Sequence, residues 1–135
     1  MRMKKMLLLV LSVGLICETA SQNTKQTISH LIKHIDTCEF YSVMLEEALQ
    51  SYILQKNKGE LELLIIEHII NPDFPFNHIK GGQDSTLTCK DMSVIKQHYE
   101  KWWRKMKKYS MRKIKSLRNQ SDPLYGTNYS WTTYN

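Results

Sequence analysis

The sequence lacks the motifs through which most enzymes bind or activate a substrate. Its 135 residues contain no Gly-rich phosphate-binding loop, no nucleophile elbow and no zinc-protease signature. His30 and His34 stand one helical turn apart, but their spacing offers no third ligand, so we expect two solvent-facing polar residues. Glu60 and Glu62 are interpreted as a solvated face or as partner contacts. We therefore expect no enzymatic activity, no catalytic residue, no metal and no cofactor.

Cysteine is also scarce, since the chain has only three. Cys17 lies in an apolar N-terminal segment, which leaves Cys38 and Cys89 as one pair, 51 positions apart. Two solitary cysteines in an oxidising compartment usually form a disulfide, and two free buried thiols are the alternative. Closing a loop of this length with a disulfide would stabilise the fold by roughly 4 kcal/mol.

Long apolar runs are missing apart from residues 6–16, which follow a basic start at residues 2–5. This run of 11 residues is shorter than the roughly 20 that a transmembrane helix needs. The order is typical of a secretory signal peptide over residues 1–21, with an uncleaved anchor as the alternative. We therefore expect a soluble, extracellular protein. Sequons at Asn119 and Asn128 agree with secretion and are candidate glycosylation sites.

Acidic residues are scarce in the last third of the chain. From Lys90 to Arg118 there are 11 Lys or Arg residues against Asp91 and Glu100, and the net charge of the chain is +6. Such a stripe can be a solvated helix face, can bind sulfated polysaccharide, or can enter a membrane interface if its apolar side is exposed. The expected compartment argues against nucleic acid as a partner. The candidate polysaccharide contacts are Lys101, Arg104, Lys105, Lys108 and Arg112.

Apolar residues recur with helical spacing in four segments. The expected helices cover about residues 24–35, 38–56, 60–70 and 89–118, the first two being either separate or fused. Phe40 and Met44 belong to the expected core face of the second helix. Asn57 with Glu60, and Thr88 with Asp91, have the spacing of capping boxes at the starts of the third and last helices. Residues 73–87 contain Pro75 and two glycines and are interpreted as a loop. The sequence therefore predicts an all-α helical-bundle domain over residues 22–120, followed by a flexible C-terminal tail over residues 121–135.

The surroundings of the two cysteines resemble a known family. Cys38 directly precedes the segment 39–47, and Cys89 directly precedes the basic, Trp-containing last helix. With the apolar third segment 62–67, this pattern resembles the short-chain four-helix cytokines of the interleukin-2, interleukin-15 and interleukin-21 group, over most of residues 24–118. The resemblance implies a short-chain helical cytokine-like bundle with Cys38 paired to Cys89. The link between the first two helices is too short for parallel neighbours, so a shortened or rearranged first helix is also expected.

The same resemblance implies a monomeric secreted cytokine that binds receptor chains and regulates lymphocyte growth or immune responses. Members of the group contact a common gamma chain through a glutamine late in the last helix, and the matching positions here are Lys108 and Tyr109. The third helix would contact a second receptor chain through Glu60, Glu62 or Glu67. The alternative function is that of a secreted cationic host-defence protein or of a polysaccharide- or membrane-binding protein.

Overall fold

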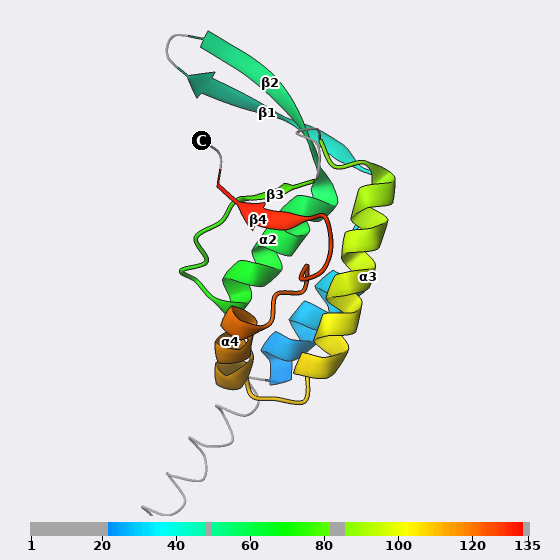
Figure 1. The fold of residues 1–135 in the computed structure, drawn as a ribbon, viewed down its shortest axis with the longest axis vertical. Coiled ribbons are helices and arrows are strands. Elements are labelled where there is room, and N and C mark those ends of the chain that lie inside the picture. The colour runs from blue at the N-terminus through cyan, green and yellow to red at the C-terminus, as the bar shows by residue number, and fades with distance from the viewer. Residues whose placement is uncertain (1–21, 48–49, 82–85, 134–135) are drawn as a thin grey trace, which may run out of the picture.

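The computed structural model describes residues 22–47, 50–81 and 86–133 of the chain (Figure 1). The signal peptide expected over residues 1–21 lies outside these ranges. An N-terminal helix covers residues 22–33. The elements that follow it are β1 (Phe40–Glu47), β2 (Gln50–Asn57), α2 (Lys58–Ile70), β3 (His78–Lys80), α3 (Cys89–Met106), α4 (Met111–Gln120) and β4 (Ser130–Thr132).

The prediction of an all-α bundle is wrong, because the described residues include two small antiparallel sheets beside the helices. Strands β1 and β2 form a hairpin whose pairing runs from Phe40↔Asn57 to Glu47↔Gln50. Strands β3 and β4 come from distant parts of the chain and pair around Ile79↔Trp131. The domain is therefore mixed α/β, and the four-helix bundle that the interleukin resemblance implies is not its fold.

The hairpin occupies the place of the expected second helix, residues 38–56. Its sequence includes three aromatic residues and two β-branched ones, types that favour strands, and short apolar runs do not separate helix from strand by periodicity alone. Two residues assigned to the core face of that helix are exposed, Phe40 by 42% and Met44 by 66%. Figure 1 shows the hairpin extending away from the helices, so these residues have no core to face.

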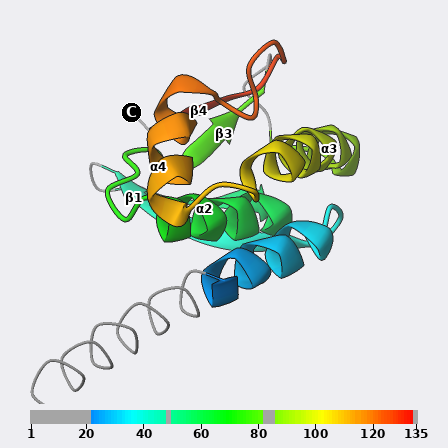
Figure 2. The same ribbon diagram turned by 90° about the horizontal axis from the view of Figure 1, so that it is seen from below.

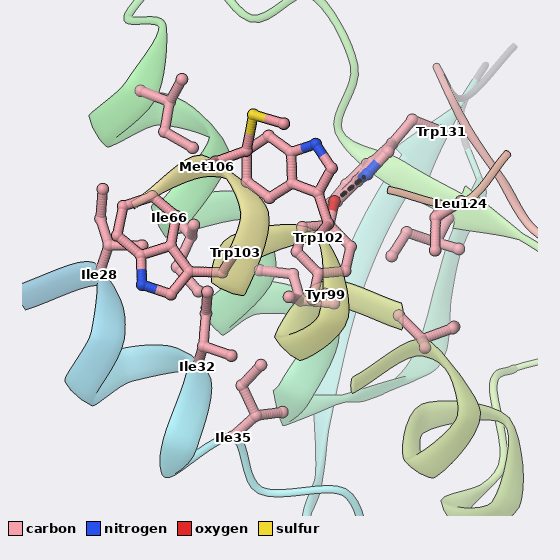
Figure 3. Packing of buried hydrophobic residues seen from close by; sticks show 14 of the residues in the cluster. Ile28, Ile32, Ile35, Ile66, Tyr99, Trp102, Trp103, Met106, Leu124 and Trp131 are labelled. Atoms are coloured by element: carbon pink, nitrogen blue, oxygen red, sulfur yellow. Dashed lines mark hydrogen bonds between the residues drawn. The ribbon is translucent and has the colours of Figure 1, made fainter. Parts of the chain in front are cut away.

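The hydrophobic core lies between the helices and the β3–β4 sheet. Helix α3 supplies its centre, where Ile95 and Tyr99 are fully buried. Figure 3 shows Ile28 and Ile32 of the N-terminal helix directed toward Trp103 of α3. Seen from below in Figure 2, the N-terminal helix and α4 lie on opposite sides of α2. The predicted helices at 24–35 and 60–70 thus exist with slightly shifted ends, at 22–33 and 58–70.

The expected last helix, residues 89–118, is interrupted and forms α3 and α4. Thr88 begins α3 with the predicted capping box, in which its hydroxyl accepts from the Asp91 main-chain N–H. The hydroxyl of Ser110 accepts from the main-chain N–H of Lys113 and starts α4. A serine that bonds to the main chain in this way competes with a continuous helix. The turn between Met106 and Met111 therefore ends α3 and starts α4 as a separate helix, which lies against α2 (Figure 2).

The expected flexible tail, residues 121–135, is part of the fold over its described residues 121–133. Leu124 and Trp131 are buried in the core. The Trp131 indole donates to the Tyr99 hydroxyl at 2.7 Å, as the dashed line in Figure 3 marks. Trp131 thus closes one side of the domain.

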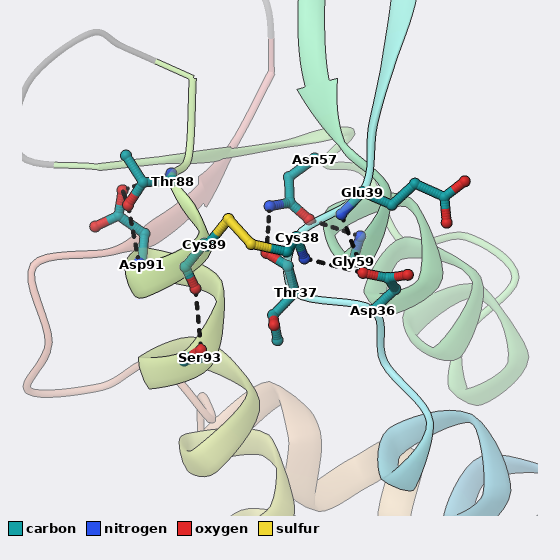
Figure 4. Close-up of a disulfide and its surroundings, with 10 residues drawn as sticks. All are labelled: Asp36, Thr37, Cys38, Glu39, Asn57, Gly59, Thr88, Cys89, Asp91 and Ser93. Carbon is teal, nitrogen blue, oxygen red and sulfur yellow. Dashed lines mark hydrogen bonds between the residues drawn. A yellow bond between two sulfur atoms is a disulfide. The ribbon is translucent and has the colours of Figure 1, made fainter.

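Cys38 and Cys89, which the sequence predicts as a pair, are joined by a disulfide (Figure 4). The side-chain oxygen of Asp36 accepts from the Cys38 main-chain N–H at 2.9 Å and fixes the turn before the bridge. Asn57 caps α2 by accepting from the Gly59 main-chain N–H at 2.9 Å. The base of the hairpin is therefore attached to the beginnings of both α2 and α3.

Candidate polyanion-binding surface

The second half of α3, the following turn and α4 together form a strongly basic surface. No acidic residue occurs between Glu100 and Asp122. The exposed cationic side chains in this interval, called the basic face from here on, are Lys101, Arg104, Lys105, Lys107, Lys108, Arg112, Lys113 and Lys115. Within the described ranges none of these side chains forms an ion pair. Their charges are therefore available to a partner.

The apolar side of each helix determines why these cations face outward. Helix α3 buries Tyr99, Trp102, Trp103 and Met106 along one stripe, which leaves Lys101, Arg104 and Lys105 toward solvent. Helix α4 buries only Ile114. Met111, Leu117 and Arg118 are half-buried, and the first-turn residues Arg112 and Lys113 are exposed. The fold thus presents a short cationic face on each of these two helices.

The first turn of α4 contains no acidic residue, unlike the first turns of α2 and α3. Glu60 lies in the first turn of α2 and Asp91 in that of α3, whereas α4 has Arg112 and Lys113 there. Positive side chains are unfavourable at the positive end of a helix dipole. An anion bound over this end would reduce that repulsion, so the local electrostatics favour an anionic partner.

The turn after α3 is held in place by the N-terminal helix. The Lys25 ammonium donates to the main-chain carbonyl oxygens of Lys107 and Tyr109, each at 3.3 Å. A cation at the C-terminal end of a helix is electrostatically favourable. Lys108 lies over the ring of Tyr109, with its ammonium 5.1 Å from the ring centroid. The two residues expected at the gamma-chain site, Lys108 and Tyr109, therefore belong to the basic face or border it.

Two of the three glutamates expected to contact a receptor are inside the protein. Glu60 is buried and accepts from the Ile79 main-chain N–H at 2.7 Å, while His78 Nδ1 lies 2.9 Å from the same carboxylate oxygen. The expected return of Glu60 to Asn57 in a capping box is therefore replaced by a contact that holds β3. Glu62 is half-buried and accepts from the Asp36 main-chain N–H at 3.2 Å.

Glu67 is the centre of a buried polar network. Its side chain is fully buried and accepts from the Tyr99 hydroxyl at 2.7 Å and from Arg118 Nε at 2.9 Å. Burial raises the pKa of the Glu67 carboxyl above its ordinary value, against the opposing effects of Arg118 and Tyr99. Burial also raises the pKa of Tyr99. This network links α2, α3 and α4, so Glu67 stabilises the fold and is not offered to a receptor.

The apolar side of the last two helices is not available to a membrane interface, because Tyr99, Trp102 and Trp103 are buried. None of the helices in the described part of the chain is both long enough and apolar enough to span a membrane.

The ring centroids of His30 and His34 lie 4.4 Å apart. Over residues 22–47, 50–81 and 86–133, no set of three or more His, Cys, Asp or Glu side chains is arranged to hold a metal ion. Both sequon asparagines are exposed, Asn119 in the last turn of α4 and Asn128 just before β4.

Sequence reasoning missed a groove beside the basic face. It lies between α3 and the segment that ends and follows α4, and its volume is about 450 Å³. Its walls come from two stretches that are separated in the sequence, around Lys101 and around Ser121, so no local pattern could have indicated it. The residues lining it are His98, Lys101, Trp102, Lys105, Asn119, Gln120, Ser121, Asp122, Pro123 and Tyr125.

These features define a small disulfide-linked α/β domain with one basic face. The family described as a domain of unknown function (DUF4943) matches residues 17–132, and the chain therefore belongs to this family. No curated protein and no solved structure matches the chain significantly.

Proposed function

We propose that this protein is secreted and binds sulfated polysaccharide through its basic face. The observation that carries the proposal is the group of eight exposed cations over α3, the following turn and α4, none of them paired with an acid within the described residues. A linear polyanion gains from many such contacts at once, because each contact neutralises charge without demanding a shaped pocket. The signal-like N-terminus and the disulfide support an extracellular location.

The experiment is retention on immobilised heparin as a function of salt, with two double variants that remove equal charge. Lys108→Gln with Arg112→Gln alters the basic face. Lys33→Gln with Lys90→Gln alters exposed cations elsewhere, since Lys90 lies in the first turn of α3, about 25 Å along the helix axis from Lys107. We expect the first variant to elute at clearly lower salt and the second to elute near the unsubstituted protein. Equal elution of both variants, or no retention of the unsubstituted protein, would contradict the proposal.

A second candidate function, that of a cytokine-like ligand for receptor chains on lymphocytes, is favoured by an exposed apolar pair on α2. Leu61 and Ile65 are 41% and 45% exposed and stand one helical turn apart. Large apolar residues grouped on a surface often mark a protein interface. In this candidate Leu61 and Ile65, with half-buried Glu62 between them, would contact the receptor in place of the buried Glu60 and Glu67.

Binding to lymphocytes separates the two candidates. Attachment through polysaccharide should disappear after heparinase treatment and should weaken steeply with salt. Attachment through an apolar interface should survive both treatments and should be lost in Leu61→Asp with Ile65→Asp. Cells that retain the protein after heparinase, but not the α2 variant, would favour the receptor ligand over the polysaccharide-binding protein.

A further inference from the structure

We propose that the groove between α3 and the end of α4 is a binding site for one acidic sugar unit, a mono- or disaccharide that carries sulfate or carboxylate. The proposal deepens the proposed function and rests on it, because it adds a shaped subsite next to the basic face. The volume of about 450 Å³ falls within the range of small-molecule pockets, about 300–1,000 Å³.

One wall of the groove is cationic. His98, Lys101 and Lys105 lie at spacings of three and four residues on α3, so they follow one another along a single helix face. Both lysines are exposed, and neither forms an ion pair within the described residues. A sulfate or carboxylate at this wall would accept from two ammonium groups one helical turn apart.

The opposite wall carries groups suited to the rest of a sugar. The amides of Asn119 and Gln120 offer both donors and acceptors to hydroxyl groups. The carboxylate of Asp122 can accept only, and it would repel an anion placed on this side. The ligand is therefore oriented, with its anionic group toward α3 and its hydroxyl groups toward the end of α4.

Tyr125 provides the observation that favours a sugar over a simple anion. Its side chain is 90% exposed although it lines the groove, whereas most aromatic residues of the fold are wholly or partly buried. A flat ring with an apolar face and a polar tip can cover the apolar face of a sugar ring. Inorganic phosphate or sulfate would gain nothing from such a platform.

The groove is formed by packed elements and so exists before a ligand arrives. Trp102 is nearly fully buried, and its indole donates to the Ser121 main-chain carbonyl at 3.1 Å. The Asp122 carboxylate accepts from the Leu124 main-chain N–H at 2.9 Å, which fixes the turn after α4. Buried Leu124 attaches this turn to the core.

Asn119 also begins the sequon Asn-Gln-Ser, so a glycan on Asn119 would start inside the groove. The test therefore uses the full chain, secreted, with Ser121→Ala. This substitution removes the sequon but keeps the Asn119 amide and the carbonyl that accepts from Trp102. Calorimetric titrations compare a heparin-derived sulfated disaccharide, sialyllactose and lactose. We expect the two acidic probes, or one of them, to bind and lactose not to bind, and the stronger acidic probe identifies the anionic group.

Three variants in the Ser121→Ala background then locate the site. Tyr125→Ala should weaken binding of the preferred probe about tenfold, and its ring is too exposed for its loss to unfold the protein. Lys101→Gln with Lys105→Gln should abolish the binding. Lys107→Gln with Lys113→Gln removes the same charge from the basic face outside the groove, and should leave probe binding unchanged while lowering retention on heparin.

The two proposals fail in distinguishable ways. Equal weakening by both lysine pairs, with no effect of Tyr125→Ala, would overturn the groove and leave general electrostatic binding. No binding of either acidic probe, with retention on heparin intact, would also overturn the groove alone. If the unsubstituted protein is not retained on heparin, but an acidic probe binds specifically, the proposed polysaccharide function is overturned and the groove is retained.

Discussion

Arg118→Met should be among the most destabilising single substitutions in the chain. Arg118 Nε donates to both carboxylate oxygens of the fully buried Glu67, at 2.9 and 3.0 Å. Removing one partner of a buried ion pair leaves the other charge uncompensated, and such losses are about 3–5 kcal/mol. Methionine keeps part of the packing of the arginine stem but loses the contact of the guanidinium with the Phe74 ring, now 5.6 Å from its centroid.

The size of this loss should depend on pH, because Glu67 can take up a proton. Burial raises the pKa of Glu67 above 4.5, and removal of the guanidinium should raise that pKa further. Between the pKa of Glu67 in the unfolded chain and its higher pKa in the folded protein, Glu67 carries a proton only in the folded protein. The stability connected with Glu67 is therefore complete below the unfolded pKa and falls as the pH rises through the folded pKa. The deficit of Arg118→Met should grow as the pH rises above 4.5.

Urea unfolding followed by tryptophan fluorescence measures this effect, since three tryptophans are buried in the core. Arg104→Met is the matched control, because Arg104 is exposed and forms no ion pair within the described residues, and its effect should stay within about 0.5 kcal/mol. Glu67→Gln with Arg118→Met should lose less than the sum of the two single variants. If Arg118→Met cost no more than Arg104→Met at every pH, the reasoning about the buried pair would be refuted.

Three further variants test other parts of the fold. Cys38→Ala with Cys89→Ala should lower the free energy of unfolding by about 4 kcal/mol in urea titrations, from the loop of 51 residues that the disulfide closes; a change below about 1 kcal/mol would contradict this account. Gly59→Ala would place a methyl group 2.6 Å from the Asp36 carbonyl oxygen, so thermal unfolding should reveal a loss of about 1–3 kcal/mol. Partial burial acts to raise the pKa of Asp91, but hydrogen bonds from Thr88 and Tyr129 hold that pKa below 3.8. The stability that Asp91 contributes is therefore present above pH 3.8 and lost as the pH falls through the lower folded pKa, so Asp91→Asn should cost about 1 kcal/mol near neutral pH and progressively less in acid. A loss independent of pH would count against the ionised cap.

Local patterns predicted those elements whose burial follows from a short stretch of sequence. The apolar spacing in α2 and the Thr88–Asp91 cap of α3 are local features, and both are present close to where they were expected. The hairpin was mistaken for a helix because Val43, Met44 and Ile53 fit a helical stripe as well as they fit strands. Which alternative wins depends on whether a core lies opposite, and Phe40 and Met44 of the hairpin are exposed.

The candidate surfaces, too, were predictable from the sequence only where they depend on neighbouring residues. The acid-free interval between Glu100 and Asp122 could be identified from the sequence, and the basic face follows from it. The burial of Glu60 and Glu67 could not, because their partners Ile79 and Arg118 are 19 and 51 residues away. A buried glutamate and an exposed one look alike in a helical pattern until their partners are known.

The sequence by itself determined the positions of two of the helices, the cysteine pair and the unbalanced positive charge of the last third of the chain, since each depends on neighbouring residues or on counting. Only the tertiary structure decided the β3–β4 sheet, the inclusion of residues 121–133 in the core and the groove beside Tyr125. The physical reason is that these features are contacts between segments far apart along the chain, and such contacts are selected by how much apolar surface and how many polar groups the whole fold can satisfy together.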